Sequence, residues 1–329
     1  MTTKDIREKI EVLVDESRSK TLKEANAIKH IGVDTDSDLV ILIISLGQVG
    51  GEAEKKLRRQ LAKIIKLDLG FKGIKIQFEE DKKTTCRNCK FIIIGSGKGG
   101  VGRSFVTANL AYALRRQNKK VGIIDADVYG STIPYFLDMT IKNPVVNKES
   151  MIIPFKKFGI EVMSTVFFAE KDQPVIWRGQ MLNSMLNNFF SQVNWDKNLD
   201  YILIDVPAGT GDTFIDLKAF VPSAEVLLVT TPEPIDNKVT LKSGYAYQEL
   251  KQNIIGIIEN KTQLLSSKEI KDNKTLETSQ TDEVAEKLGV EVLAKIPYTK
   301  PKEHISLFNS GEEVGQIFDD LATLLIIRY

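Results

Sequence analysis

Residues 91–104 of this 329-residue chain read Phe-Ile-Ile-Ile-Gly-Ser-Gly-Lys-Gly-Gly-Val-Gly-Arg-Ser. Phe91 to Ile94 is a short apolar run, which is typical of a buried parallel strand. A glycine-rich loop follows, and a segment with helical periodicity begins at Ser104. Glycine lets backbone N–H groups turn inward, and the positive end of a helix dipole lies behind them. A strand, a glycine-rich loop and a helix in this order therefore predict a phosphate-binding loop.

The loop also has the spacing of the P-loop pattern G-x-x-x-x-G-K-[ST], in which Ser104 would bind Mg²⁺. One position departs from the pattern, because Arg103 stands where it has lysine. Arginine keeps the positive charge but is broad and planar, so we expect ATP binding to be weakened and hydrolysis to be slow. The predicted nucleotide-binding residues of the loop are Gly97, Lys98, Gly99, Gly100, Val101, Gly102, Arg103 and Ser104.

Two further apolar runs end in carboxylates. Asp125 and Asp127 follow the run that begins at Val121, and Asp205 follows the run that begins at Tyr201 and leads into a second glycine-rich loop. Ligands of open parallel sheets bind at the carboxyl ends of the strands, so these acids should converge on the phosphates. Together the three segments predict a nucleotide-binding protein.

The composition is that of an ordinary globular protein, with 42% hydrophobic and 27% charged residues and a net charge of +1. This near-neutral balance calls for neither nucleic acid nor a membrane as partner. The first thirty residues are charged throughout, unlike a signal peptide, and the apolar stretches are too short to span a bilayer. Two cysteines fit a reducing compartment. We expect a soluble cytoplasmic protein with no membrane partner.

Three regions follow one another along the chain. Residues 1–80 predict a small α+β domain, with helices at 4–16 and 52–67 and strands at 27–33, 39–45 and 73–78. Residues 81–90 form a polar linker that contains a Cys-x-x-Cys pair. Residues 91–329 alternate strands and helices, which predicts an α/β domain with a mostly parallel sheet flanked by helices. Its further strands are expected at 160–163, 225–230, 254–259 and 290–296, with an apolar helix at 181–190, a last helix from about 312, and irregular chain at 128–158.

The loop resembles the deviant Walker A loop, whose mark is an additional lysine near its start, here Lys98. Further matches make the Mrp/ApbC family of P-loop ATPases, described as iron–sulfur cluster carriers, the most similar family. They are Asp125-Ala-Asp-Val-Tyr-Gly130, Trp177-Arg-Gly179 and Asp205-Val-Pro-Ala-Gly-Thr-Gly-Asp212. The resemblance covers residues 91–329 and implies a P-loop NTPase related to MinD and ParA. Residues 1–80 resemble the small MIP18-type (DUF59) domain that often precedes this ATPase.

The resemblance implies a role for each matching residue. Backbone N–H groups of Gly99 to Ser104 would hold the β-phosphate, and Asp205 would hold Mg²⁺ through a water molecule. Lys98 would reach the ATP of a partner in a homodimer, and Asp127 would orient the attacking water. Lys98, Asp127 and Asp205 are thus the expected catalytic residues, and Asn260 and the loop at Pro297 would contact adenine.

The family's cluster-binding Cys-x-x-Cys is absent from its usual place, where residues 261–267 read Lys-Thr-Gln-Leu-Leu-Ser-Ser. The reactive cysteine of the small-domain family is also missing, since residues 46–51 hold none. The only pair is Cys86 and Cys89. Its spacing suits thiolate ligation of an iron–sulfur cluster or zinc, and two copies in a dimer would supply four ligands. A redox-active pair and two incidental linker thiols are the alternatives.

Two main functions therefore remain. The first is an ATP-dependent iron–sulfur carrier, with client or scaffold proteins as partners. The second is a cluster-free, ATP-switched regulator of DNA or of a protein, because residues 175–190 resemble SalA-type transcriptional regulators that lack the cysteine pair. The basic helix 52–67 would then be the DNA surface, although a solvated helix face explains its charge as well. A MinD-like membrane cycle ranks last, because the helix after Glu312 lacks a polybasic amphipathic pattern.

Overall fold

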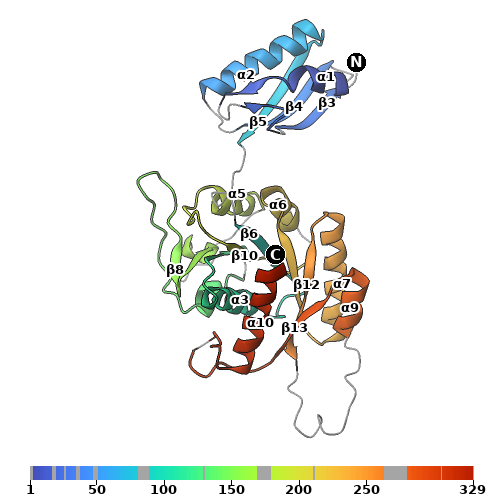
Figure 1. Cartoon of the computed structure of the whole chain (residues 1–329). Coiled ribbons are helices and arrows are strands. Elements are labelled where there is room, and N and C mark those ends of the chain that lie inside the picture. Colours follow the sequence, from blue (N-terminus) through green and yellow to red (C-terminus); the bar gives the residue numbers. More distant parts are fainter. Residues whose placement is uncertain are drawn as a thin grey trace. The chain divides into compact units, whose positions relative to one another are not determined.

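A computed structural model describes residues 3–16, 20–25, 27–34, 38–46, 51–80, 89–128, 130–168, 179–209, 212–262, 280–304 and 306–328. The chain divides into two compact units, Met1–Lys82 and Lys83–Tyr329 (Figure 1). The boundary between them falls inside the predicted linker, and each unit has a hydrophobic core of its own.

The small unit is built on a three-stranded sheet in the order β3-β4-β5, with β3 antiparallel and β5 parallel to the central β4. Leu57, Leu61 and Ile65 recur every four residues and are buried in the core. The elements are α1 (Thr3–Ile10), β1 (Val14–Asp15), β2 (Lys20–Thr21), β3 (Ile28–Asp34), β4 (Leu39–Leu46), α2 (Glu52–Lys63) and β5 (Gly73–Glu80).

The first helix of the small unit is shorter than the sequence predicts, whereas the second has the predicted length but changes its type near its end. The first ends at Ile10, because Val14 and Asp15 leave the helix to pair with Lys20 and Thr21 in a short antiparallel ladder. The second ends as an α-helix at Lys63 and continues as one π-helical turn over Ile64–Asp68. Apolar periodicity alone does not distinguish such ends from more helix.

The large unit contains an eight-stranded sheet in the order β13-β12-β11-β6-β10-β7-β9-β8, and every pair is parallel except β8 with β9. The predicted parallel α/β fold is therefore confirmed. The strands are β6 (Lys90–Gly95), β7 (Val121–Asp125), β8 (Phe155–Lys157), β9 (Ile160–Ser164), β10 (Tyr201–Asp205), β11 (Glu225–Thr230), β12 (Ile254–Thr262) and β13 (Val292–Pro297).

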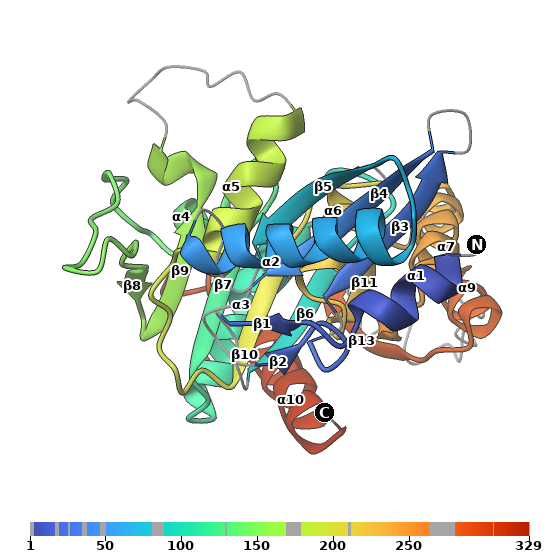
Figure 2. The same cartoon turned by 90° about the horizontal axis from the view of Figure 1, so that it is seen from above.

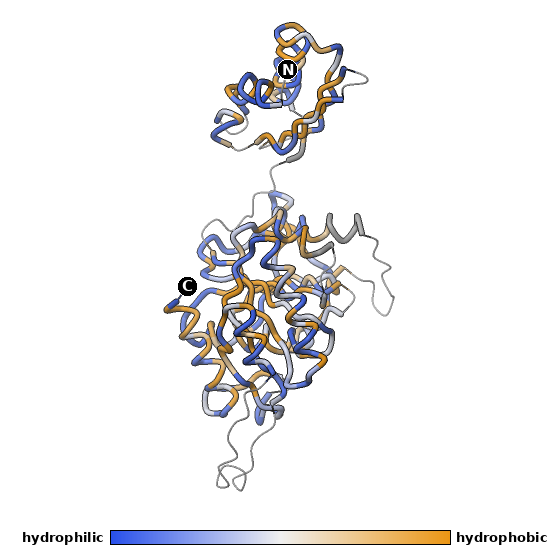
Figure 3. The backbone as a smooth tube through the Cα atoms, turned by 90° about the vertical axis from the view of Figure 1, so that its right-hand side faces the viewer, coloured by the Kyte–Doolittle hydropathy of each residue, from blue (hydrophilic) through white to orange (hydrophobic). Residues whose placement is uncertain are grey.

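Helices cover both faces of this sheet (Figures 1 and 2). One hydrophobic cluster joins the sheet to α3, α4 and α10, and a second joins the other face to α5, α6, α7 and α9. In Figure 3 the most hydrophobic segments of the unit lie in its interior. The helices are α3 (Arg103–Arg116), α4 (Ile133–Phe136), α5 (Gly179–Ser191), α6 (Asp212–Phe220), α7 (Pro234–Glu249), α9 (Gln280–Leu288) and α10 (Glu313–Arg328).

The segment predicted to be irregular, residues 128–158, contains the short elements α4 and β8. Neither is long enough to show a period in the sequence. In α5, Leu186, Phe189 and Phe190 are buried in the core. Among the described residues no helix is both long and apolar enough to cross a membrane.

Strand register decides where the functional side chains meet. β10 lies between β6 and β7, and its last residue, Asp205, is opposite Ile94 of β6 and Asp125 of β7. The glycine-rich loop and both carboxylate-bearing strand ends therefore share the carboxyl edge of the sheet, as predicted. Cys89 precedes β6 and lies at the opposite edge.

Candidate functional site

The glycine-rich loop connects β6 to α3. At Gly97 an added Cβ would lie 2.3 Å from the backbone of Val239 in α7, so only glycine fits there. Gly102 has a φ of 93°, in the left-handed region that favours glycine. A Cβ at Gly99 or Gly100 would meet no other atom within 4 Å. The loop thus leaves open space beside Gly99 and Gly100 and leads into the N-terminus of α3, where an anion such as a nucleotide phosphate is favoured.

Ser104 and Asp205 lie in direct contact beside the loop. The Ser104 hydroxyl donates a hydrogen bond to Oδ2 of Asp205, and the Thr107 hydroxyl lies 3.4 Å from Oδ1. Burial raises the pKa of Asp205 to about 6, although the Ser104 and Thr107 hydrogen bonds and the Arg103 charge act in the opposite direction. A hydroxyl and a carboxylate next to a phosphate site are oxygen ligands that suit Mg²⁺.

Asp125 and Asp127 have different surroundings. Asp125 is fully buried, and its Oδ2 accepts hydrogen bonds from the Ser164 hydroxyl at 2.9 Å and the Ile133 N–H at 3.3 Å. Burial and the neighbouring Asp205 raise the pKa of Asp125 well above its usual range. The Asp127 side chain keeps 16% of its surface exposed and lies nearer solvent. Of the two, Asp127 is therefore the less enclosed.

Arg103 points toward Asp127. Its Nη2 lies 2.8 Å from Asp127 Oδ2, and its side chain is only 8% exposed. Its Nη1 is buried without a hydrogen-bond partner among the described residues. The Asp127 carboxylate accepts a further hydrogen bond, at Oδ1, from the Gly130 N–H at 3.1 Å. The arginine of the loop is thus paired with the predicted water-orienting carboxylate, a contact that the sequence did not indicate.

Lys98 is paired within its own chain. Its Nζ lies 2.7 Å from Oδ1 of Asp236, whose Oδ2 accepts a hydrogen bond from the Thr231 hydroxyl at 2.7 Å. Burial opposes ionisation of Asp236, but the hydrogen bonds from Lys98 and Thr231 and the Lys98 charge outweigh it, and the pKa is lowered. Sequence reasoning missed Asp236, although an acid in the first turn of a helix that follows a central strand was a usable signal.

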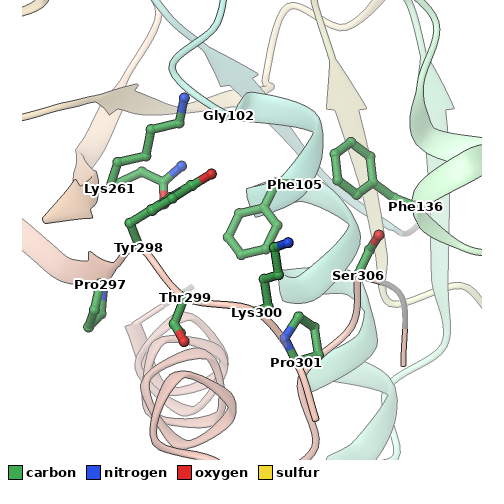
Figure 4. A pocket seen from close by; sticks show the side chains of 11 residues that line it. Gly102, Phe105, Phe136, Lys261, Pro297, Tyr298, Thr299, Lys300, Pro301 and Ser306 are labelled. Atoms are coloured by element: carbon green, nitrogen blue, oxygen red, sulfur yellow. The ribbon is translucent and has the colours of Figure 1, made fainter. Parts of the chain in front are cut away.

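A cavity of about 290 Å³ adjoins the loop (Figure 4). Asn260 and Pro297, the predicted adenine contacts, both line it, and so do Phe105, Tyr298 and Lys261, which the sequence did not single out. The Asn260 amide donates to the Val101 carbonyl at 2.8 Å, and Lys261 Nζ donates to the Gly100 carbonyl at 2.7 Å. The end of β12 therefore connects this cavity to the phosphate loop.

The cysteine pair is only partly described. Cys89 is half-buried against the core just before β6, whereas Cys86 lies outside the described residues, as do residues 263–270, which follow β12. Among the described residues, no group of three or more histidine, cysteine or acidic side chains could hold a metal ion.

The basic helix α2 is partly neutralised. Lys55 pairs with Glu52, Lys56 with Glu16, and Arg58 with Glu54. Exposed pairs of this kind stabilise little, but they reduce the charge available to DNA. The DNA surface stays a prediction.

Neutralising Asp205 should stabilise the protein when nucleotide and Mg²⁺ are absent. Between pH values of about 4 and 6 the Asp205 carboxyl group loses its proton in the unfolded chain but keeps it in the folded chain. The free energy of unfolding of the parent therefore falls as the pH rises through this range, and it stays lower above pH 6. At pH 7 we expect Asp205→Asn to raise the free energy of unfolding by about 2 kcal/mol, and at pH 4.5 by much less. Urea unfolding in EDTA measures both, and an equal change at the two pH values would contradict the expectation.

Comparison with known proteins agrees with this geometry. A family model described as "ParA: NUBPL iron-transfer P-loop NTPase" matches residues 88–318. The iron-sulfur cluster carrier protein of Bacillus subtilis (strain 168) is 33% identical over 344 residues, covering 96% of this chain and 97% of that protein. The protein of the same name from Haemophilus influenzae is 29% identical, over 97% of this chain and 91% of that one.

Solved structures show the same fold. A nucleotide-binding protein from Archaeoglobus fulgidus, in complex with ADP, has a TM-score of 0.52 and 28% identity, covering 73% of this chain and 89% of that one. The cell division ATPase MinD of Pyrococcus furiosus has a TM-score of 0.51 at 23% identity, covering 73% and 99%. Because the family match spans more than half of the sequence, this chain belongs to the NUBPL-type family of iron-transfer P-loop NTPases.

Proposed function

We propose that this chain is a slow ATPase that carries an iron–sulfur cluster and acts as a homodimer. The observation that carries the proposal is the grouping of Lys98, Ser104, Asp127 and Asp205 around an open glycine-rich loop. It occurs in a chain whose full-length relatives are named iron-sulfur cluster carrier proteins. The small unit, which the Bacillus relative also spans, is proposed to be a MIP18-type domain.

The loop would bind ATP by its backbone. N–H groups from Gly99 to Ser104 would hold the β-phosphate in the open space beside Gly99 and Gly100, at the N-terminal end of α3. The Ser104 hydroxyl would bind Mg²⁺ directly and Asp205 through a water molecule, and the ion would neutralise phosphate charge.

Hydrolysis would then need positioning more than covalent chemistry. A water oxygen attacks the γ-phosphorus, the bond from that phosphorus to the β,γ-bridging oxygen breaks, and ADP and phosphate are released. Asp127 would orient the water, and Lys98 of the partner would stabilise the charge on the transferred phosphoryl group. For that, the Lys98 side chain, 52% exposed here, must leave Asp236.

The cavity beside the loop would hold the base. The Asn260 Nδ2 donates to Val101, so its Oδ1 is left to accept a hydrogen bond. Adenine carries an amino donor on its six-membered ring where guanine carries a carbonyl acceptor. This polarity supports ATP as the nucleotide, with Pro297 beside the ring.

Replacing Arg103 by lysine should speed the reaction. A lysine ammonium is a compact charge that fits between loop carbonyls and phosphate oxygens, whereas the planar guanidinium does not. We expect Arg103→Lys to raise ATP turnover on the order of tenfold, because charge is better placed on the phosphates. Phosphate release measures this, and an unchanged or lower turnover would refute slow hydrolysis caused by Arg103.

The cargo would be held by the thiolates of Cys86 and Cys89, once the disulfide in which Cys89 takes part is reduced. β6 is six residues long, so its two ends lie about 20 Å apart, and Cys89 stands at the end away from the loop. A homodimer joined through Lys98 would hold each Cys89 at the end of β6 away from the nucleotide sites, which disfavours four thiolates shared within it. We therefore propose that a client or scaffold protein supplies the remaining ligands.

Iron analysis tests this cargo directly. After anaerobic reconstitution with glutathione as a source of thiolate, the parent should hold about two to four iron atoms per chain, with equal acid-labile sulfide. Cys86→Ser/Cys89→Ser should hold none, because serine does not replace a thiolate ligand. A parent without stoichiometric iron would refute the cluster role.

That outcome would leave the second candidate, a cluster-free regulator. It is favoured by the absence of cysteine from residues 261–267. If α2 binds DNA, the affinity must fall steeply with salt, because phosphate contacts release counterions. A salt-insensitive or absent affinity for duplex DNA would exclude this candidate's DNA form.

A further inference from the structure

The ion pair between Arg103 and Asp127 joins a residue of the phosphate loop to the carboxylate proposed to orient the attacking water. Arg103 opens α3 inside the phosphate loop, and Asp127 follows β7. Nη2 lies 2.8 Å from Oδ2, and both side chains are largely enclosed, at 8% and 16% exposure. The other carboxylate oxygen accepts the Gly130 N–H at 3.1 Å. Both oxygens of Asp127 are thus engaged by the protein itself.

The guanidinium also has an unused donor. Nη1 is buried and has no hydrogen-bond partner in the described part of the chain. An unpaired buried donor on a charged group is costly, so a further acceptor at this place is favoured. A phosphoryl oxygen in the loop is such an acceptor, and arginine binds phosphate and carboxylate with similar geometry.

We propose that Asp127 and the nucleotide's phosphate compete for Arg103. While the ion pair is closed, Asp127 is withheld from the attacking water and the guanidinium is withheld from phosphate. A bound phosphate draws Arg103 away and releases the carboxylate for its role. This inference rests on the proposed nucleotide binding, and it makes Arg103 a positioning residue for Asp127.

The competition depends on the shape of arginine. A guanidinium presents several donors in a rigid fork and reaches the Asp127 carboxylate from within the loop. A lysine has one nitrogen, which donates to loop carbonyls and to phosphate oxygens, so it holds Asp127 poorly. Removing the Asp127 charge should therefore improve nucleotide binding strongly with arginine at position 103 and weakly with lysine.

The test is a double-mutant cycle on nucleotide affinity, without hydrolysis. N-methylanthraniloyl-ADP is titrated with Mg²⁺ against the full chain, Asp127→Asn, Arg103→Lys and the double variant. Asp127→Asn should tighten binding about tenfold in the arginine background and less than about twofold in the lysine background. Equal factors in the two backgrounds would overturn the inference.

A matched control separates competition from loss of negative charge near the loop. Asp236→Asn neutralises the other carboxylate that is paired to this loop, through Lys98, and does not touch Arg103. Its effect on ADP affinity should be the same with arginine or lysine at position 103. If the effect of Asp236→Asn on ADP affinity differs between the two backgrounds as much as the effect of Asp127→Asn does, the coupling reflects general electrostatics and the inference is wrong.

Arg103→Gln gives a second background if Arg103→Lys does not fold, as judged by its thermal transition. Glutamine is uncharged and forms no ion pair with Asp127, so the gain in nucleotide affinity caused by Asp127→Asn must be smaller in this background too. The proposed function fails separately: a parent chain that binds no adenine nucleotide refutes it, whereas binding without coupling refutes only the competition.

Discussion

Replacing Lys98 by alanine is expected to lower ATP turnover about a thousand-fold while leaving ADP affinity within a few-fold of the parent. In the proposed mechanism the ammonium stabilises charge that develops only during phosphoryl transfer, so its loss affects the rate rather than binding. Phosphate release and fluorescent-nucleotide titration measure the two effects. A matching loss of nucleotide affinity would contradict this role.

Lys98 also contacts Asp236 in its own chain, and a control must separate the two functions. Asp236→Asn breaks the same ion pair and keeps the lysine. If Lys98 served only that contact, both variants would lose the same activity. We expect Asp236→Asn to retain most of the turnover, because the lysine is then free to reach a partner.

A mixing experiment tests whether Lys98 acts on the partner subunit. Lys98→Ala and Asp127→Asn are each expected to be inactive. In a mixed dimer, the site of the Lys98→Ala subunit has its own Asp127 and the partner's Lys98. An equal mixture should therefore recover about a quarter of parent activity, since half of the dimers are mixed and each has one complete site. No recovery would mean that Lys98 acts within its own subunit.

The second large effect is expected at Gly97. A methyl group there would stand 2.3 Å from the Val239 backbone and 2.4 Å from the Thr240 backbone. Backbone cannot rotate away as a side chain can, so the loop or α7 must shift. We expect Gly97→Ala to cost about 2–3 kcal/mol of folding stability and to abolish measurable nucleotide binding. Thermal unfolding with and without ADP measures both.

Gly99→Ala is the matched control, two residues along the same loop. Its added methyl group would meet no other atom within 4 Å. The nucleotide-free protein should therefore unfold at nearly the parent temperature, with a change of about 0.5 kcal/mol or less. If both alanine variants lose the same stability, crowding against α7 does not explain why position 97 is glycine.

Much of the fold and the phosphate part of the site follow from local sequence. Strand, glycine-rich loop and helix at 91–104 predict β6, the loop and α3, and apolar runs ending at Asp125 and Asp205 predict β7 and β10. Since parallel strands end at one edge, the convergence of these acids needs no tertiary knowledge. Short elements such as α4 and β8 were missed, because too few residues carry a period.

Tertiary structure alone decided which charged groups are paired. Lys98 and Asp236 are 138 positions apart, and Asn260 and Val101 are 159 apart. Such contacts depend on strand order and on how α7 and β12 lie beside the loop, and local periodicity carries neither. The sequence determined that a phosphate loop exists and which residues belong to it. Packing of α7 against Gly97 and the reach of a buried arginine decided that its lysine and arginine are each held by a carboxylate of the same chain.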